Sequence, residues 1–216
     1  MLEQITFPVG PLACNCTILG DAPSATAVVI DPGAQVDGIL LRLAQRHWRL
    51  TDIIITHAHI DHIGGAGELK RVTGARVWMN PRDRQLHQSI ESQAHWLGMP
   101  IPEPVTIDAS LDDSFDLKLS GTRLEILETP GHTQGSVCLY IPSQGKLFAG
   151  DTLFAGSVGR TDLPGGDDRA IIDSIRTRLL PLPDTTVVIP GHGPFTTIGR
   201  ERGSNPFLNT NPKPAQ

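Results

Sequence analysis

Four side chains of the types that bind divalent metals fall within six consecutive residues, in the run Thr56-His57-Ala58-His59-Ile60-Asp61-His62. Imidazole nitrogen and carboxylate oxygen are ligands of zinc and related ions. A folded chain has little reason to crowd histidines elsewhere, because neighbouring imidazoles lose solvation and repel one another once protonated. The run follows residues 51–56, a β-branched apolar segment that predicts a buried strand, and precedes a glycine-rich turn at 64–67. We therefore expect the ligands on a loop at the end of a core strand.

Three more candidate ligands follow other predicted strands, each after a turn that contains glycine. His132 and His192 end Pro-Gly-His turns, and Asp151 follows Gly150. Each alone has an ordinary explanation as a turn residue. Together with the run at 57–62 they indicate a metal site, and strand ends that meet at one edge make a dinuclear site geometrically natural. The other histidines lie on predicted helices and are expected to be non-ligating: His47, His87 and His95.

The pattern of apolar residues predicts strands and helices in both halves of the chain. The expected strands are 5–9, 14–19, 26–30, 51–56, 76–79, 115–119, 124–128, 137–141, 146–149 and 185–189. The expected helices are 36–48, 68–73, 83–97 and 171–179. Runs of adjacent strands exclude a simple doubly wound sheet. The sequence therefore predicts an α+β fold in which two mixed β-sheets pack face to face with helices outside, an αββα sandwich.

The length of 216 residues suits one globular domain, which we expect over residues 1–208. The proline-rich segment 99–104 is the best candidate for an internal linker. Residues 209–216 are polar and rich in proline, which is typical of a disordered tail.

Composition excludes several classes of function. A formal net charge of −5 and a pI near 5.9 argue against nucleic-acid binding. No segment has the eighteen or so apolar residues of a membrane helix, and the first four residues lack the basic start of a signal peptide. The three cysteines, Cys14, Cys16 and Cys138, form no Cys-x-x-Cys motif and are expected to be buried apolar residues in a reducing compartment. Cytoplasmic location is the default expectation.

The chain resembles hydrolases of the metallo-β-lactamase fold, and more narrowly the short, bacterial-type members of the glyoxalase II (hydroxyacylglutathione hydrolase) group. The matching segments run through most of the chain: 56–65 (THAHIDHIGG), 129–136 (TPGHTQGS), 148–154 (FAGDTLF), 159–162 (GRTD) and 190–193 (PGHG). The first segment is specific for the fold, and Gly150-Asp151 is typical of members with a bridging aspartate. The resemblance implies the αββα sandwich described above.

The resemblance also implies a ligand set for two divalent ions. The ligands form two triplets and one shared carboxylate: His57, His59 and His132 for the first ion, Asp61, His62 and His192 for the second, and Asp151 bridging both. Zinc is the first expectation, and iron and manganese are compatible. Asp61 is also the candidate catalytic residue as a proton acceptor, although coordination reduces its basicity. Asp31 matches a family aspartate behind the metal loop, so it either orients a ligand histidine or forms an ordinary Asp-Pro-Gly turn.

The implied activity is hydrolysis of a small-molecule thioester of the S-lactoylglutathione type. Two cations roughly 3.5–4 Å apart lower the pKa of a shared water from about 15.7 towards 7, and they stabilise the oxyanion that forms. A thioester suits such a site because a thiolate, whose reference pKa is about 8.5, leaves with little help from an acid.

The chain departs from larger glyoxalase II enzymes where those enzymes bind glutathione. Those enzymes have a lysine and two tyrosines that line the pocket for the thiol. In this chain Arg160 stands at the position of the lysine, and Asp162 and Pro194 stand at the positions of the tyrosines. Arg160 is a candidate to hold a substrate carboxylate, or else a surface arginine. After His192 only short segments stand in for the helical extension of those enzymes, so the sequence leaves recognition of a glutathione conjugate open.

Other functions compete with this interpretation. A related persulfide dioxygenase would place one iron on His57, His132 and Asp151, and a lactonase is a third choice. True β-lactamases lack the bridging aspartate, and nucleases of this fold add a domain or a basic surface. A non-catalytic metal-binding protein is the alternative from another class, although structural zinc sites are usually closed and rich in cysteine. The sequence leaves the acyl group, the thiol, the native metal and the oligomeric state open.

Overall fold

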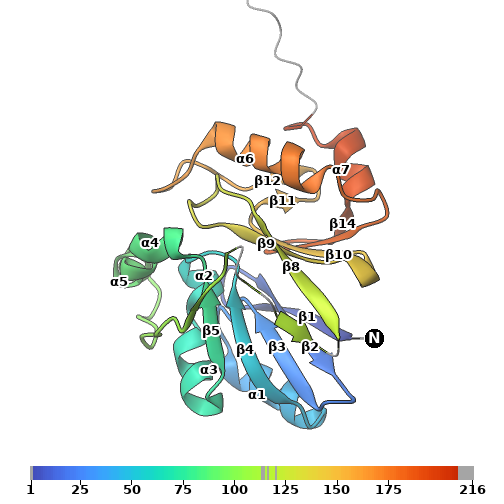
Figure 1. Ribbon diagram of the computed structural model, residues 1–216. Helices are drawn as coiled ribbons and strands as arrows, with labels where there is room; N and C mark the ends of the chain where they lie inside the picture. The colour runs from blue at the N-terminus through green and yellow to red at the C-terminus, as the bar shows by residue number, and fades with distance from the viewer. Residues whose placement is uncertain (1, 113–114, 116, 120, 209–216) are drawn as a thin grey trace, which may run out of the picture.

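The protein forms two stacked β-sheets that lie between two outer layers of helices (Figure 1). The computed structural model describes residues 2–112, 115, 117–119 and 121–208. This architecture is the αββα sandwich predicted from the sequence. The predicted tail at 209–216 lies outside the described residues, and the single domain over 1–208 stays a prediction.

The first sheet combines a meander with parallel crossovers. Its order is β1 (Glu3–Val9), β2 (Cys14–Asp21), β3 (Thr26–Ile30), β4 (Arg49–Ile55), β5 (Arg76–Met79) and β6 (Ala109–Ser110). Strands β1 to β3 pair antiparallel, and β3 to β6 pair parallel. Helices α1 (Val36–Gln45) and α3 (Ala66–Thr73) connect the parallel strands.

The second sheet is antiparallel except at one pair. Its order is β14 (Thr196–Thr197), β13 (Val187–Pro190), β10 (Lys146–Gly150), β9 (Val137–Ile141), β8 (Thr122–Glu128) and β7 (Leu117–Leu119). Strands β10 and β13 are parallel. Between them lie the hairpin of β11 (Leu153–Phe154) and β12 (Ser157–Val158), and helix α6 (Asp168–Ser174), which continues as a π-helical segment, Ile175–Leu179. Helix α7 (Ile198–Ser204) follows β14 and lies with α6 over this sheet (Figure 1).

Alternating side chains of single strands fill three apolar layers. In β3, Ala27 and Val29 pack towards the helices of the first half, whereas Val28 and Ile30 pack between the sheets. In β9, Leu139 points between the sheets, and its neighbours Cys138 and Tyr140 pack on the side of α6. This period of two is the physical reason why both sheets are buried on both faces.

The two sheets meet along one edge, where several strands end. The amide of Val137 at the start of β9 donates to the carbonyl of Thr56 at 3.0 Å, just after β4. The amide of Asn15 in β2 donates to the carbonyl of Gly191 at 2.7 Å, just after β13. Each hydrogen bond joins a strand of one sheet to the residue just after a strand of the other sheet, so that side chains from both halves converge there.

Two predicted helices differ from the structure. The helix expected over 83–97 is two helices, α4 (Arg84–Gln88) and α5 (Ile90–Leu97). Ser89 separates them at φ −94° and ψ 10°, and its hydroxyl donates to the carbonyl of Leu86 at 2.8 Å. A serine that bonds to the preceding turn competes with the helical pattern. The helix expected over 36–48 ends at Gln45, because His47 adopts φ 56°.

The proline-rich segment is a loop rather than a linker between domains. Residues 99–108 have no regular structure and lead from α5 to β6, which belongs to the first sheet. Glu103 of this loop pairs with Arg71 of α3 at 2.9 Å. In the part of the chain that the structure describes, no helix combines the length and apolar character needed to cross a membrane. The three cysteines are free and buried, as expected.

Candidate metal centre

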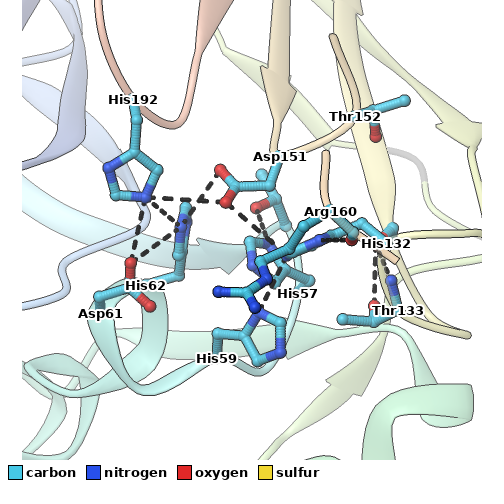
Figure 2. Close-up of polar contacts among 12 residues, drawn as sticks. His57, His59, Asp61, His62, His132, Thr133, Asp151, Thr152, Arg160 and His192 are labelled. Carbon is cyan, nitrogen blue, oxygen red and sulfur yellow. Dashed lines mark hydrogen bonds and ion pairs between the residues drawn. The ribbon is translucent and has the colours of Figure 1, made fainter. Parts of the chain in front are cut away.

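The structure brings all seven predicted ligands together at the edge where the sheets meet (Figure 2). They come from four segments that are distant in sequence: residues 57–62, with His57 and His59 after β4 and Asp61 and His62 in the short helix α2 (Ile60–Ile63), then His132 between β8 and β9, Asp151 after β10, and His192 after β13. The side chains thus lie where the predicted strand ends converge, and that they bind metal stays a prediction.

Three histidines, His57, His59 and His132, form the first triplet, which lies to the right of His62 and Asp61 in Figure 2. The Nδ1 atom of His59 lies 2.9 Å from the Nε2 atom of His132. The ring of His57 is centred 4.9 Å from that of His59 and 4.7 Å from that of His132. One nitrogen atom of each ring lies within 4.8 Å of the other two.

Two histidines and one aspartate form the second triplet. The Nε2 atom of His192 lies 3.1 Å from Oδ2 of Asp61 and 3.3 Å from Nε2 of His62. The third side of this triangle is the distance of 3.6 Å between Nε2 of His62 and Oδ2 of Asp61. Four donors around a zinc ion, with bonds of 2.0–2.1 Å, lie about 3.3 Å apart, so these separations match a metal site.

Asp151 lies between the two triplets. Its Oδ1 atom is 3.4 Å from Nε2 of His62, and its Oδ2 atom is 3.6 Å from Nε2 of His132 and 3.7 Å from Nε2 of His192. The carboxylate thus faces both sets of donors, as a bridging ligand would.

Backbone carbonyl groups behind the site determine which nitrogen of two histidines faces it. Nδ1 of His132 donates to the carbonyl of Arg160 at 2.7 Å, and Nδ1 of His192 donates to the carbonyl of Leu12 at 2.9 Å. A carbonyl oxygen only accepts, so Nδ1 holds a proton, and in the neutral ring Nε2 presents a lone pair to the centre. This is the arrangement that metal-binding histidines have in proteins.

Asp31 supports the site from behind, which decides between its two predicted roles. Its Oδ2 atom lies 2.9 Å from Nδ1 of His62, and its carboxylate accepts from the amide and hydroxyl of Thr56 at 2.8 and 2.7 Å. The hydroxyl of Thr56 lies 3.1 Å from Nδ1 of His57. Asp31 thus orients ligand histidines. It does so at φ 51°, a strained conformation for a residue other than glycine.

The donor atoms of the cluster are better satisfied by a pair of cations than by contacts with one another. Nε2 of His57 and Oδ1 of Asp151 are buried and have no hydrogen-bond partner. An unpaired buried polar atom costs roughly 1–3 kcal/mol, and lone pairs that converge repel each other. Divalent cations would relieve both penalties. The cluster is therefore suited to a dinuclear metal site, with donor types that accept zinc, iron or manganese.

The surroundings keep two histidines of the first triplet, His57 and His59, neutral. Burial and the neighbouring imidazoles lower the pKa of His57 well below its usual value. Burial, followed by the effect of His132, lowers the pKa of His59 to about 3. Neutral imidazole is the form that binds metal, so these two rings are ready to act as ligands at neutral pH.

The second triplet carries more charge. Burial opposes ionisation of Asp61, but His62 and the hydrogen bond from His192 hold its pKa well below the ordinary range. Burial likewise opposes protonation of His192, yet the carboxylates of Asp61 and Asp151 raise its pKa. In the metal-free protein, a protonated imidazole group thus offsets the negative charge of the carboxylates of Asp61 and Asp151, which metal ions would otherwise neutralise.

Sequence reasoning missed Asp83, which connects the loops of the first triplet. The side chain is 1% exposed. It accepts hydrogen bonds from the amide of Ala58, between His57 and His59, and from Thr133, next to His132. Burial raises its pKa, and these hydrogen bonds oppose the increase. A Pro-Arg-Asp turn gives no signal of this role, because the partner loop lies 50 residues away.

Glycine at position 191 allows the backbone to approach the site closely. A Cβ atom there would lie 2.1 Å from Oδ1 of Asp151 and 2.7 Å from Cε1 of His62. This contact explains why the turn before His192 has glycine where other side chains would displace two ligands.

A cleft of about 910 Å³ opens above the ligand cluster. Arg160, the predicted substrate residue, lies at this cleft and beside the first triplet (Figure 2). Its guanidinium group is exposed and forms a bidentate pair with Asp162 at 2.7 Å. The structure therefore places Arg160 where a substrate could reach it, already paired with a carboxylate.

Comparison with known sequences agrees with this geometry. The sequence model of the metallo-beta-lactamase superfamily matches residues 9–192. Hydroxyacylglutathione hydrolase GloC of Haemophilus influenzae is 41% identical over 211 residues, which cover 94% of this chain and 97% of that protein. YqgX of Bacillus subtilis, named a probable metallo-hydrolase, is 33% identical and covers 94% of this chain and 96% of its own.

Solved structures are also similar. BLEG-1, a B3 metallo-beta-lactamase, has a TM-score of 0.89 at 34% identity and covers 96% of this chain and 100% of its own. TTHA1623, in a di-iron-bound form, has a TM-score of 0.85 at 36% identity, with 94% and 100% covered. ETHE1 from Myxococcus xanthus has a TM-score of 0.78 at 27% identity, with 95% and 83% covered.

Proposed function

Because the chain belongs to the metallo-β-lactamase superfamily, we propose that it is a dinuclear-metal hydrolase that cleaves thioesters of the S-(2-hydroxyacyl)glutathione type, such as S-lactoylglutathione. The observation that carries the proposal is the position of Asp151 between the two triplets. One triplet would serve a single ion, whereas a carboxylate shared by two triplets serves a pair. The name of the GloC relative supports the choice of substrate.

In this proposal each triplet holds one divalent ion and Asp151 binds both. The pair of ions, when bound, supplies a water of lowered pKa and polarises the substrate carbonyl. Zinc is the first choice, and the di-iron form of TTHA1623 supports including iron in any test.

The protein orients the ligand side chains and balances the charge of the ions. The carbonyl groups behind His132 and His192 fix the neutral tautomer, and the carboxylates of Asp61 and Asp151 balance the cationic charge. The lowered pKa of Asp61 keeps it ionised, which suits a ligand, whereas a carboxylate of low pKa is a weak proton acceptor. We therefore assign ion binding to Asp61 first, and proton acceptance only second.

The cleft favours a substrate whose leaving group needs no proton. Besides the ligands, the described ionisable side chains at the cleft are Arg82, Asp83 and Arg160. The arginines stay protonated at neutral pH, and the carboxylate of Asp83 is occupied as an acceptor. A thiolate leaves without an acid, but an amine does not. This difference supports a thioester over the amide of a β-lactam.

Metal analysis combined with thiol release tests the proposal. Purified protein should contain about two ions per chain and should release thiol from S-lactoylglutathione. Asp151→Asn should lower both the metal content and the rate. His47→Gln, which changes a histidine remote from the ligand groups, should alter neither. Protein that holds two ions but leaves the thioester intact would contradict the substrate, and full activity without metal would contradict the mechanism.

One competing function has structural support. The similarity to ETHE1 gives some weight to a mononuclear-iron persulfide dioxygenase. The convergence of Asp61, His62 and His192 at 3.1–3.6 Å provides a second triplet that a single ion does not need. Oxygen uptake with glutathione persulfide, together with one iron per chain, would favour the dioxygenase. Asp61→Ala protein that unfolds, with no turnover by the wild type to lose, would favour a non-catalytic metal-binding protein.

A further inference from the structure

One wall of the cleft is a continuous face of helices α4 and α5. The lining residues recur at helical spacing, from Leu86 through Ser89 and Gln93 to Trp96 and Leu97. This spacing shows that one side of the helix pair faces the cleft along its whole length.

Gln93 attaches this wall to the ligand loop. Its Oε1 atom accepts from the amide of Ile60 at 3.0 Å, and its Nε2 atom donates to the carbonyl of Ala58 at 3.3 Å. Both partners adjoin ligand residues. Gln93 thus joins the wall to the candidate metal centre, and Trp96 lies about one helical turn from Gln93, roughly 5 Å further along the helix.

The outer part of the wall is apolar and exposed. Trp96 is 68% exposed and Leu97 is 37% exposed, and Leu163 and Pro164 also line the cleft. A large aromatic side chain that remains in water at the mouth of a cleft offers a binding surface for an apolar group.

The charged side chains of the cleft also favour an apolar group as the ligand of this wall. The two arginines of the cleft are already paired, Arg82 with Glu128 at 3.1 Å and Arg160 with Asp162 at 2.7 Å. The rest of the described lining outside the ligand cluster is neutral except for Asp83. Glutathione carries two carboxylates and an ammonium group, which this wall does not match.

Resting on the proposed thioester hydrolysis, we propose that the wall formed by α4 and α5 binds the acyl group, and that the preferred acyl group is large and apolar. A lactoyl group would fill little of a 910 Å³ cleft. A phenyl-bearing acyl group in the same position would contact Trp96 and Leu97, and burial of its ring would favour binding.

A matched pair of substrates tests this inference. S-Lactoylglutathione and S-mandeloylglutathione share the thiol and the 2-hydroxy acid, and they differ by a methyl group against a phenyl ring. The wild type should show a kcat/KM about tenfold higher for the mandeloyl thioester. Trp96→Ala should bring the ratio close to one by raising KM for that substrate. Leu41→Ala, at an exposed position of α1, should leave the ratio unchanged.

Binding to the metal-free protein gives a second readout that needs no turnover. Calorimetry should find about tenfold tighter binding of the mandeloyl thioester, and Trp96→Ala should remove the difference. Equal kcat/KM for both substrates, or a ratio unaffected by Trp96→Ala, would overturn the inference while the hydrolase remains. If the metal-loaded protein hydrolyses neither thioester, the proposed function fails, and the calorimetric ratio still decides whether the wall binds apolar groups.

Discussion

The Asp83 carboxylate accepts the amide hydrogen of Gly135 at 2.6 Å, across an interval of 52 residues. Its other oxygen accepts from the amide of Ala58 at 3.0 Å and from the hydroxyl of Thr133 at 2.9 Å. One buried side chain therefore joins the loop after β4 to the loop that carries His132. The first triplet has its spacing because these two loops are held together.

Asp83→Asn should weaken the first triplet. An amide nitrogen cannot accept a hydrogen bond, so at least one of the donors at Ala58, Thr133 and Gly135 would lose its partner. Loss of a supporting hydrogen bond behind metal ligands typically lowers metal affinity 10- to 100-fold. Competition with a chelator, followed by elemental analysis, measures the loss.

Asp52→Asn is the matched control for this prediction. Asp52 is also a buried aspartate, 3% exposed, and it accepts from Trp78 at 2.7 Å within the first sheet. Its substitution should reduce the free energy of unfolding by roughly 1–3 kcal/mol and leave the metal content unchanged. Equal metal affinity in Asp83→Asn and wild-type protein would show that Asp83 is only structural.

Asp31→Asn should affect the second triplet instead. With the amide oxygen on Thr56, the amide nitrogen would face Nδ1 of His62 and donate to it. That contact requires the tautomer in which Nε2 of His62 holds the proton, so the ring no longer presents a lone pair to the centre. Asparagine tolerates the φ of 51°, so little backbone strain is added. Elemental analysis should find about one ion per chain, and two tightly bound ions would contradict this account.

The candidate ligands were predictable from sequence because four of them cluster in the run at 57–62 and the other three follow a strand after a short turn. Local turn residues, such as Pro190 and Gly191 before His192, mark the end of a strand without knowledge of the fold. Asp83 had no such mark, since its role depends on partners that only the packed sheets bring near. Ser89 was missed for a related reason: the apolar spacing is the same on both sides of the break, so a periodic pattern does not reveal it.

The very short strands lay beyond sequence reasoning too. β6, β11, β12 and β14 have two residues each, which is too few for alternation to appear. Their pairing depends on neighbouring chain segments, as in β14, where Thr196 pairs with Val188. The overall layering was nevertheless predictable, because longer strands such as β3 and β9 are apolar on both faces, which requires a cover on each side.

The pH dependence of the metal-free protein should reveal the environment of His59. Its pKa is about 3 in the folded protein and about 6.5 in an unfolded chain. As pH falls below 6.5, His59 binds a proton in the unfolded chain but stays unprotonated in the folded protein. Stability is therefore lost by about 1.4 kcal/mol per pH unit until the pH reaches about 3.

His59→Gln isolates this contribution from those of the other histidines. The variant lacks the titrating ring, so its free energy of unfolding should fall less steeply between pH 6.5 and 3 than that of the wild type. Urea denaturation in the presence of a chelator, repeated at several pH values, gives both curves. Parallel curves would mean that His59 is solvated in the metal-free protein.

Gly191→Ala should abolish the metal site while the protein stays folded. The added Cβ would lie 2.1 Å from Oδ1 of Asp151, so the bridging carboxylate or the turn must move, and a shift of that size separates the donors of both triplets. Gly193→Ala is the control, because its φ of 75° adds backbone strain of about 1–2 kcal/mol while no atom lies within 4 Å of the new Cβ. We expect Gly191→Ala to lose both ions and thioesterase activity, and Gly193→Ala to keep them with a lower melting temperature. Two bound ions in Gly191→Ala would mean that Asp151 can leave its position without loss of the metal site, and that the bridge is dispensable.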